Sequence, residues 1–126
     1  SGQTMHPLAW TPTLLNMKAR LDAAAQVTFN SVLLNLYRYG QDSMGWHSDD
    51  EPELGTNPVI ASVSLGATRI FQFKHKQNPD LKLSLDLTHG SLLLMCGATQ
   101  HFWKHQVPKT KKPLGPRINL TFRVIV

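Results

Sequence analysis

Apolar and polar residues follow two different periods along the chain, one near the N-terminus and another after residue 30. Leucine and methionine recur at near-helical spacing between residues 14 and 21, and three consecutive alanines follow at 23–25. This pattern predicts an amphipathic helix over residues 13–25. Thr11 followed by Pro12 supplies a cap and a first turn for that helix.

After the helix, short segments of strand-like composition are separated by turn residues. Glycine, proline and asparagine interrupt the chain near residues 66, 79 and 90. The predicted strands cover residues 32–39, 46–49, 59–65, 69–76, 82–87, 91–96, 102–107 and 117–126. Many short strands at this spacing are typical of a sandwich or jelly roll. We therefore expect a mainly β fold, a double-stranded β-helix with the N-terminal helix packed on it, as one domain over residues 1–126.

The composition fits a globular protein of this size. The 126 residues include 41% hydrophobic and 17% charged residues, which excludes a disordered chain. No apolar run approaches the roughly 20 residues of a membrane helix, so we expect no membrane partner. The single cysteine, Cys96, excludes an internal disulfide and is interpreted as core filling. These features favour a reducing, cytoplasmic or nuclear location.

Charge is unevenly distributed along the chain. Thirteen Lys and Arg stand against eight Asp and Glu, which gives a formal net charge of +5. Acidic residues cluster at 49–53, whereas Lys109, Lys111 and Lys112 form a basic run. A basic protein suits a polyanionic partner, and such a run can contact phosphates. The run also fits an ordinary solvated loop, so charge alone does not decide between the two.

His47 and Asp49 are candidate metal ligands. In a strand, residues two apart point to the same face, so both side chains can reach one ion while Ser48 points away. Two imidazoles and one carboxylate are the ligand set of a mononuclear non-haem Fe(II) site. The third ligand is either His101 or His105, which in an extended segment lie about 13 Å apart and cannot share one ion. Zinc, or a pair of surface polar groups, is the competing interpretation.

The last predicted strand carries a polar face with two arginines. Apolar residues separate its polar members, which are Arg117, Asn119, Thr121 and Arg123. Two buried guanidiniums need anions, and a dicarboxylate satisfies both because arginine binds carboxylates through paired hydrogen bonds. Asn35 and Tyr37 share one face of another strand and could join this pocket. An ordinary strand with its polar face in water is the alternative.

Together these segments resemble the AlkB family of Fe(II)- and 2-oxoglutarate-dependent dioxygenases, most closely its nucleic-acid dealkylation branch. The order and spacing match over about residues 29–125. The matching segments are 35–37, 47–52, 60–69, 89–93, residue 105 and 116–123. The family normally carries an N-terminal segment that closes over the bound nucleotide. We expect most of that segment to be missing from this chain.

The resemblance implies a role for each of these positions. It implies that His47, Asp49 and His105 ligate iron. The residues implied for 2-oxoglutarate are Arg117 at the far carboxylate, Arg123 near the metal end, and Asn35, Tyr37 and Asn119 around them. The residues implied for the nucleic-acid substrate are Asp50 or Glu51 at the exocyclic nitrogen of a flipped base, with Tyr39 and Trp46 as walls. Core packing is an equal interpretation of Trp46.

The implied reaction uses Fe(II), 2-oxoglutarate and O2. An N-methyl group of 1-methyladenine or 3-methylcytosine in DNA or RNA is hydroxylated and leaves as formaldehyde, with succinate and carbon dioxide as co-products. Because the base must leave the duplex, we expect single-stranded substrates, with Lys74, Lys76 and the basic run on the phosphates. We also expect a monomeric enzyme. The alternatives are the same chemistry on a protein or lipid, and a metal-binding module without turnover.

Overall fold

A computed structural model describes residues 4–126 as two facing β-sheets with one long helix outside them. The strands are β1 (Thr4–Pro7), β2 (Ser31–Tyr37), β3 (Met44–His47), β4 (Ile60–Gly66), β5 (Arg69–His75), β6 (Lys82–Leu87), β7 (Leu92–Met95), β8 (Trp103–Val107) and β9 (Arg117–Arg123). The helices are α1 (Pro12–Ala25), the 3-10 helix η1 (Pro52–Leu54) and the single-turn α2 (Thr99–Phe102).

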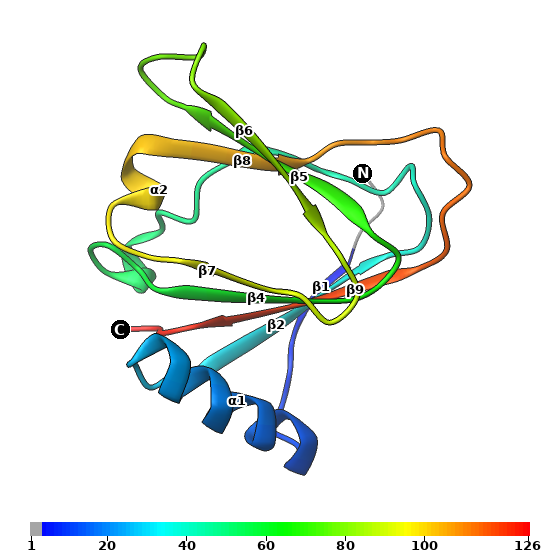
Figure 1. Cartoon of the computed structure of the whole chain (residues 1–126). Helices are drawn as coiled ribbons and strands as arrows, with labels where there is room; N and C mark the ends of the chain where they lie inside the picture. Colours follow the sequence, from blue (N-terminus) through cyan, green and yellow to red (C-terminus); the bar gives the residue numbers. More distant parts are fainter. Residues whose placement is uncertain (1–3) are drawn as a thin grey trace.

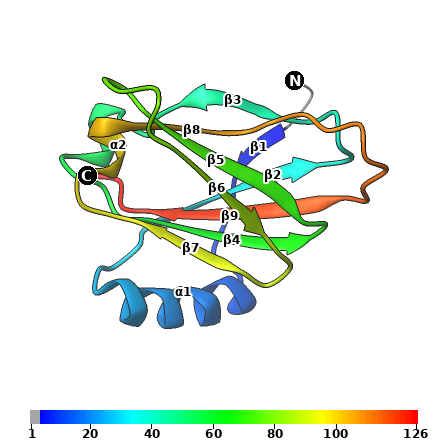
Figure 2. The same cartoon turned by 45° about the horizontal axis from the view of Figure 1, so that its top comes forward.

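Every strand pairing in the two sheets is antiparallel. The first sheet has five strands in the order β1-β2-β9-β4-β7, and the second has four in the order β3-β8-β5-β6. Figure 1 shows the two sheets one above the other, with α1 below the five-stranded sheet; Figure 2 shows the same layers after a turn of 45°. This arrangement confirms the expected mainly β, jelly-roll fold with a helix packed on it.

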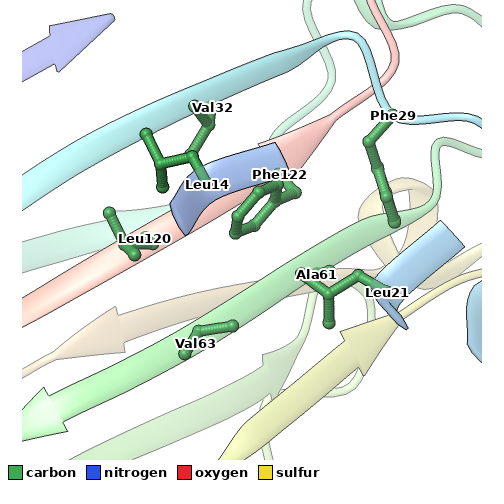
Figure 3. Packing of buried hydrophobic residues seen from close by; sticks show 8 residues of the cluster. All are labelled: Leu14, Leu21, Phe29, Val32, Ala61, Val63, Leu120 and Phe122. Atoms are coloured by element: carbon green, nitrogen blue, oxygen red, sulfur yellow. The ribbon is translucent and has the colours of Figure 1, made fainter. Parts of the chain in front are cut away.

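Helix α1 is fixed at both ends by its own sequence. The Oγ1 atom of Thr11 accepts a hydrogen bond from the Leu14 amide at 3.2 Å, and Pro12 occupies the first turn, as predicted. Gln26 ends the helix in the left-handed conformation at φ 57°. Leu14 and Leu21 are buried, and Figure 3 shows them against Val32, Ala61, Val63, Leu120 and Phe122 of the sheet.

Alternation along β9 decides which side of the five-stranded sheet is apolar. Leu120 and Phe122 face α1 and belong to the cluster of Figure 3. Because successive side chains of a strand point to opposite faces, Arg117, Asn119 and Arg123 must face the interior between the two sheets. A second apolar cluster fills part of that interior: Tyr37, Ile60, Phe71, Phe73, Leu87, Met95 and Val107. The polar face of β9 is thus enclosed rather than solvated.

The structure corrects several details of the sequence prediction. Strand β1 was not predicted, since four residues on a sheet edge are too short to show a period. Strand β7 ends at Met95, so Cys96 is exposed on the following turn and is not core filling. The segment 99–102 is helical, whereas residue 102 was expected in a strand. Within residues 4–126, α1 and the shorter helices are not long and apolar enough to cross a bilayer.

Candidate metal and co-substrate site

A cavity of about 190 Å³ opens between the two sheets and collects most of the predicted site residues. Its apolar wall includes Leu33, Met44, Phe71, Met95 and Val107. Its polar wall includes Asn35 and Tyr37 of β2, His47 of β3, Asp49, Glu51, His105 of β8, and Asn119 and Arg123 of β9.

Strand register brings the two predicted histidine ligands together. His47 of β3 is the direct partner of His105 of β8, and their ring centroids are 4.3 Å apart. Asp49 follows the end of β3, with Oδ1 at 3.8 Å from His47 Nε2 and Oδ2 at 3.6 Å from His105 Nε2. One potential ligand atom from each of the three residues lies within 4.8 Å of the others.

These separations suit ligands of one ion better than hydrogen bonds. Atoms that each lie about 2.1 Å from a common ion are about 3 to 4 Å apart, depending on the angle at the ion. Ser48 points away, as predicted, and its hydroxyl donates to the Trp103 carbonyl at 2.7 Å. His101 is exposed on α2, so among the two candidates for the third ligand the structure brings His105 to the cluster.

The orientation of the His47 ring leaves its outer nitrogen available. His47 Nδ1 lies 2.7 Å from the Gly45 carbonyl oxygen. Because a carbonyl can only accept, this bond requires the proton on Nδ1 and leaves the Nε2 lone pair facing Asp49. His105 is held differently: Phe71 stacks on its ring at 5.1 Å, and Phe73 meets it edge-on at 6.0 Å.

Burial shifts the pKa values of both His105 and Asp49 toward their neutral forms. Burial, with a smaller contribution from His47, lowers the pKa of His105 to about 3, so its imidazole is neutral at pH 7. Burial also raises the pKa of Asp49, while His47 and Arg123 oppose that shift. A neutral imidazole can ligate a metal directly, and a cation beside Asp49 would offset the cost of burying its carboxylate.

Arg117 is buried, and two nitrogen atoms of its guanidinium have no hydrogen-bond partner among the described residues. It is 2% exposed, its Nη2 donates to Ser64 Oγ at 2.9 Å, and its guanidinium lies 4.8 Å from the Tyr37 ring centroid. Its Nε and Nη1 atoms have no hydrogen-bond partner among residues 4–126. Burial lowers the pKa of Arg117. Arg117 does not itself line the cavity but lies next to Tyr37, which does.

Some of the remaining polar residues of the pocket are hydrogen-bonded within the protein, and others have polar atoms without a hydrogen-bond partner among the described residues. Asn119 donates through Nδ2 to Ser62 Oγ at 2.7 Å and to the Val63 carbonyl at 3.2 Å, so it joins β9 to β4. In contrast, Asn35 Oδ1 and Arg123 Nε are buried without a hydrogen-bond partner among the described residues. Arg123 Nε is an unpaired donor and Asn35 Oδ1 an unpaired acceptor, and buried polar atoms left open in this way indicate a polar ligand.

Comparisons with known proteins agree with this geometry. A model of the 2OG-Fe(II) oxygenase superfamily matches residues 2–123. The chain belongs to this superfamily. The solved structure of OsALKBH1 has the same fold, with a TM-score of 0.72 over 97% of this chain and 80% of that chain at 20% identity.

Curated relatives of the AlkB group are considerably closer in sequence. The chain is 47% identical to mouse alpha-ketoglutarate-dependent dioxygenase alkB homolog 3 over 97% of its own length and 46% of the relative. It is 47% identical to the bovine DNA oxidative demethylase ALKBH2 over 100% of its length and 48% of the relative. The resemblance to the AlkB family is thereby confirmed. The chain spans about half the length of the curated relatives that it matches.

The predicted substrate residues of this oxygenase chain do not all reach the cavity. Glu51 lines it, whereas the exposed Asp50 has its Oδ2 4.0 Å from Lys76 Nζ. Trp46 does not line it, because the residue before the inward-facing His47 points to the outer face of the sheet, where Lys74 Nζ lies 4.4 Å above its ring.

Tyr39 also departs from its expected place. It lies beyond the Arg117-paired end of β2, is exposed, and is covered by the Arg38 guanidinium at 5.2 Å. It is absent from the cavity lining. The structure therefore places Tyr39 and Trp46 outside the cavity, and their role as substrate walls stays a prediction.

Two buried polar residues near the site were missed by the sequence prediction. Arg69, 3% exposed, donates through Nη2 to the carbonyls of Asp42 at 2.9 Å and Pro108 at 2.8 Å, which holds two loops beside the Arg117 end of the barrel. Gln100, 1% exposed, accepts a hydrogen bond from the Asp49 amide at 2.9 Å. Arg69 ends the matching segment 60–69 but was given no role there, and Gln100 stands at no period or spacing that marks a site.

Proposed function

We propose that this chain carries the active site of an Fe(II)- and 2-oxoglutarate-dependent dioxygenase that removes N-alkyl groups from bases in DNA or RNA. The observation that carries the proposal is one cavity that joins the cluster of His47, Asp49 and His105 to Arg123, with the buried Arg117 guanidinium against its Tyr37 wall. The names of the relatives support the same activity, since they are an alpha-ketoglutarate-dependent dioxygenase and a DNA oxidative demethylase.

The donor set fits ferrous iron. Two imidazoles and one carboxylate on one side of an ion leave its other positions open, as an oxygenase requires. A structural zinc site would need a fourth protein ligand, and the described residues supply three. We assign His47, Asp49 and His105 as the ligands, with Asp49 ionised and both imidazoles neutral.

The inner part of the pocket fits a dicarboxylate. The unpaired Nε and Nη1 atoms of Arg117 are donors for the far carboxylate of 2-oxoglutarate. Arg123, whose Nε is also unpaired, lies near Asp49 and suits the carboxylate at the metal end. Asn35 and Tyr37 line the space between these arginines. Asn119 supports the pocket by joining β9 to β4.

Iron, 2-oxoglutarate and O2 supply the oxidation, which would release succinate, carbon dioxide and, from an N-methyl base, formaldehyde. The residues of this chain bind and orient the reactants. Glu51 would accept a hydrogen bond from the exocyclic amine of a flipped base. The His47 side chain, 34% exposed at the cavity, would contact the base ring while its Nε2 faces the metal.

A nucleic-acid substrate is supported by charge. The net charge is +5, and Lys109, Lys111 and Lys112 are all exposed. Such lysines contact phosphates without reading sequence. Methylation at the pairing edge weakens base pairing and lowers the few kcal/mol needed to extrude a base, so 1-methyladenine and 3-methylcytosine in single strands are the proposed targets. We further propose a monomer that acts in the cytoplasm or nucleus.

The decisive experiment measures formaldehyde and succinate released from a 1-methyladenine or 3-methylcytosine oligonucleotide with Fe(II) and 2-oxoglutarate. We expect both products from the methylated strand and neither from the unmethylated one. Asp49→Ala removes the ligand carboxylate and should abolish turnover, whereas Asp86→Ala, an exposed carboxylate on β6, should retain it. Activity in Asp49→Ala would contradict the ligand assignment.

The same assay separates the alternatives. Succinate formation without methyl loss from either base would favour the same oxygenase chemistry on a protein or lipid. Fe(II) binding without any 2-oxoglutarate binding would favour a metal-binding module without turnover.

A further inference from the structure

The backbone that carries Asp49 leaves the β-sheet two residues before the carboxylate. Strand β3 ends at His47, so no strand ladder holds Asp49 in position relative to His105. His105, by contrast, is paired on both sides, to His47 of β3 and to Phe73 of β5. The geometry of the three-residue cluster therefore depends on what fixes the turn after β3.

Gln100 supplies that fixation from α2. Its Oε1 accepts a hydrogen bond from the Asp49 amide at 2.9 Å, and its Nε2 contacts Met95 Sδ at 3.5 Å. The side chain is 1% exposed and is among the largest fully buried side chains of the described residues. Because the Gln100 side chain is buried, its hydrogen bond from the Asp49 amide is shielded from water, and the side chain has little freedom to move.

Two further contacts attach the same turn to the same part of the molecule. Ser48 Oγ donates to the Trp103 carbonyl at 2.7 Å, at the start of the strand that carries His105. Lys76 Nζ donates to the Gln100 carbonyl at 2.9 Å and lies 4.0 Å from Asp50 Oδ2. Residues 48–50 are thus held to α2 and to the beginning of β8, two residues before His105.

We propose that Gln100 is a positioning residue that fixes Asp49 at its distance from His105 and so determines the affinity of the metal site. It touches neither the metal nor the co-substrate and acts through the Asp49 backbone. The inference rests on the proposed function because it takes His47, Asp49 and His105 as ligands. Outer partners that orient ligands typically change metal affinity 10- to 100-fold when they are replaced.

The test measures Co(II) affinity by titration of the visible absorption of the ion, which needs no turnover. Gln100→Met keeps the length of the side chain and removes the acceptor, so we expect a 10- to 100-fold weaker affinity and a changed absorption band. Gln100→Glu keeps an oxygen acceptor for the Asp49 amide and should bind Co(II) more tightly than Gln100→Met. Unfolding midpoints are measured for each variant alongside.

Gln106→Met is the matched control. Gln106 lies on β8 next to His105, but its Nε2 donates to Gln72 Oε1 at 2.7 Å on the opposite face of the sheet. Gln106→Met loses a glutamine hydrogen bond on the strand that carries His105, and we expect it to keep wild-type Co(II) affinity. A general loss of stability would lower the Co(II) affinity of both variants. A positioning role lowers the Co(II) affinity of Gln100→Met alone.

The outcomes keep this inference separate from the proposed function. If wild type binds no Co(II), or if His105→Ala leaves binding intact, the proposed site itself is wrong. If wild type binds and Gln100→Met binds equally well, only the role of Gln100 is overturned. Should Gln100→Met fail to fold, amide hydrogen exchange of wild type decides: the Asp49 amide must exchange more slowly than that of Asp50, and equal rates overturn the inference.

Discussion

Arg117 is the largest fully buried side chain of the described residues, and its charge has no carboxylate partner among them. Its observed contacts include Ser64 Oγ and the Tyr37 side chain. A guanidinium in such a place costs stability unless an anion binds it. At the scale of one residue, an incomplete hydrogen-bond set is therefore the strongest sign that this pocket is built for a ligand.

Arg117→Ala is expected to weaken 2-oxoglutarate binding strongly. Removal of a buried partner of a charged group costs about 2 to 5 kcal/mol, which corresponds to a loss of about 30-fold or more in affinity. Isothermal titration of 2-oxoglutarate into the metal-loaded protein measures this. Arg20→Ala, on the exposed side of α1, should bind normally. An unchanged dissociation constant for Arg117→Ala would place the co-substrate elsewhere.

At the scale of elements, the β4–β9 pairing brings Gly66 opposite Arg117. Gly66 has φ +98°, and a Cβ there would lie 2.4 Å from the Pro116 carbonyl oxygen and 3.3 Å from Arg117 Cα. The same carbonyl accepts a hydrogen bond from the Ala67 amide at 3.0 Å, so it cannot move freely. The backbones of β4 and β9 are thus in close contact at this end of the pair, and this contact fixes the position of the Arg117 backbone.

Gly66→Ala is expected to destabilise the fold by about 1 to 3 kcal/mol and to weaken 2-oxoglutarate binding. The added methyl group must displace Pro116 and with it Arg117. Gly90→Ala is the matched control, since Gly90 has φ +78° but open space around its Cα. Gly90→Ala should lose only the stability that backbone strain costs, and it should bind 2-oxoglutarate normally. Urea unfolding and ligand titration test both variants, and normal binding by Gly66→Ala would contradict the coupling.

A second element-scale feature is the turn after β2. Asp42 accepts hydrogen bonds from the Arg38 amide at 2.9 Å, from Nε at 2.9 Å and from Nη2 at 3.0 Å. Its own carbonyl accepts from Arg69 Nη2 at 2.9 Å. The side-chain and backbone hydrogen bonds of Arg38 lower the pKa of Asp42 to about 2 from its usual 3.8. The turn is therefore held by an ionised carboxylate.

This pairing predicts a pH dependence of stability. Because the pKa of Asp42 is lower in the folded state, the unfolded chain binds the proton first, and stability is lost as the pH falls from about 4 to about 2. Asp42→Asn should be less stable at pH 7, and its difference from wild type should shrink over that range. Arg38→Met should also flatten the profile. Urea unfolding at several pH values measures the effect, and a constant difference would refute it.

At the scale of the whole molecule, one basic run lies apart from the metal site. Asp49 and Glu51 line the cavity, whereas Lys109, Lys111 and Lys112 lie in the loop that joins β8 to β9 at one end of the two sheets (Figure 1). A polyanion would be attracted by the lysines and would present only one base to the cavity. Affinity and chemistry are therefore expected to depend on different residues.

Replacement of Lys109, Lys111 and Lys112 by glutamine should weaken single-strand binding for all sequences alike. Each phosphate contact contributes about 0.7 to the slope of log affinity against log salt, so the slope should fall by about 2. Fluorescence anisotropy with a labelled oligonucleotide at several salt concentrations measures it. Arg20→Gln should keep the wild-type slope, and an unchanged slope in the triple variant would exclude the loop as a phosphate contact.

Much of the fold was predictable because its signals are local. The helix showed its own spacing and cap at Thr11 and Pro12, and the alternation along 117–123 separated an arginine face from an apolar face. The helix and this alternation depend on neighbours along the chain, so the amino-acid pattern by itself determined them. The two-residue spacing of His47 and Asp49 only offered them as candidate ligands, because Asp49 lies beyond the end of β3.

Tertiary structure alone decided which distant residues meet. The β3–β8 register placed His105 opposite His47, and the turn of α2 carried His101 to the surface. Pairing also turned Trp46 outward and buried Gln100 against Asp49. Strand register and the direction of a short helix depend on many packing contacts between residues that are far apart in the sequence. Local periodicity carries no record of that packing, which is why the spacing offered His47 and Asp49 as candidate ligands but left the third ligand and the supporting residues undecided.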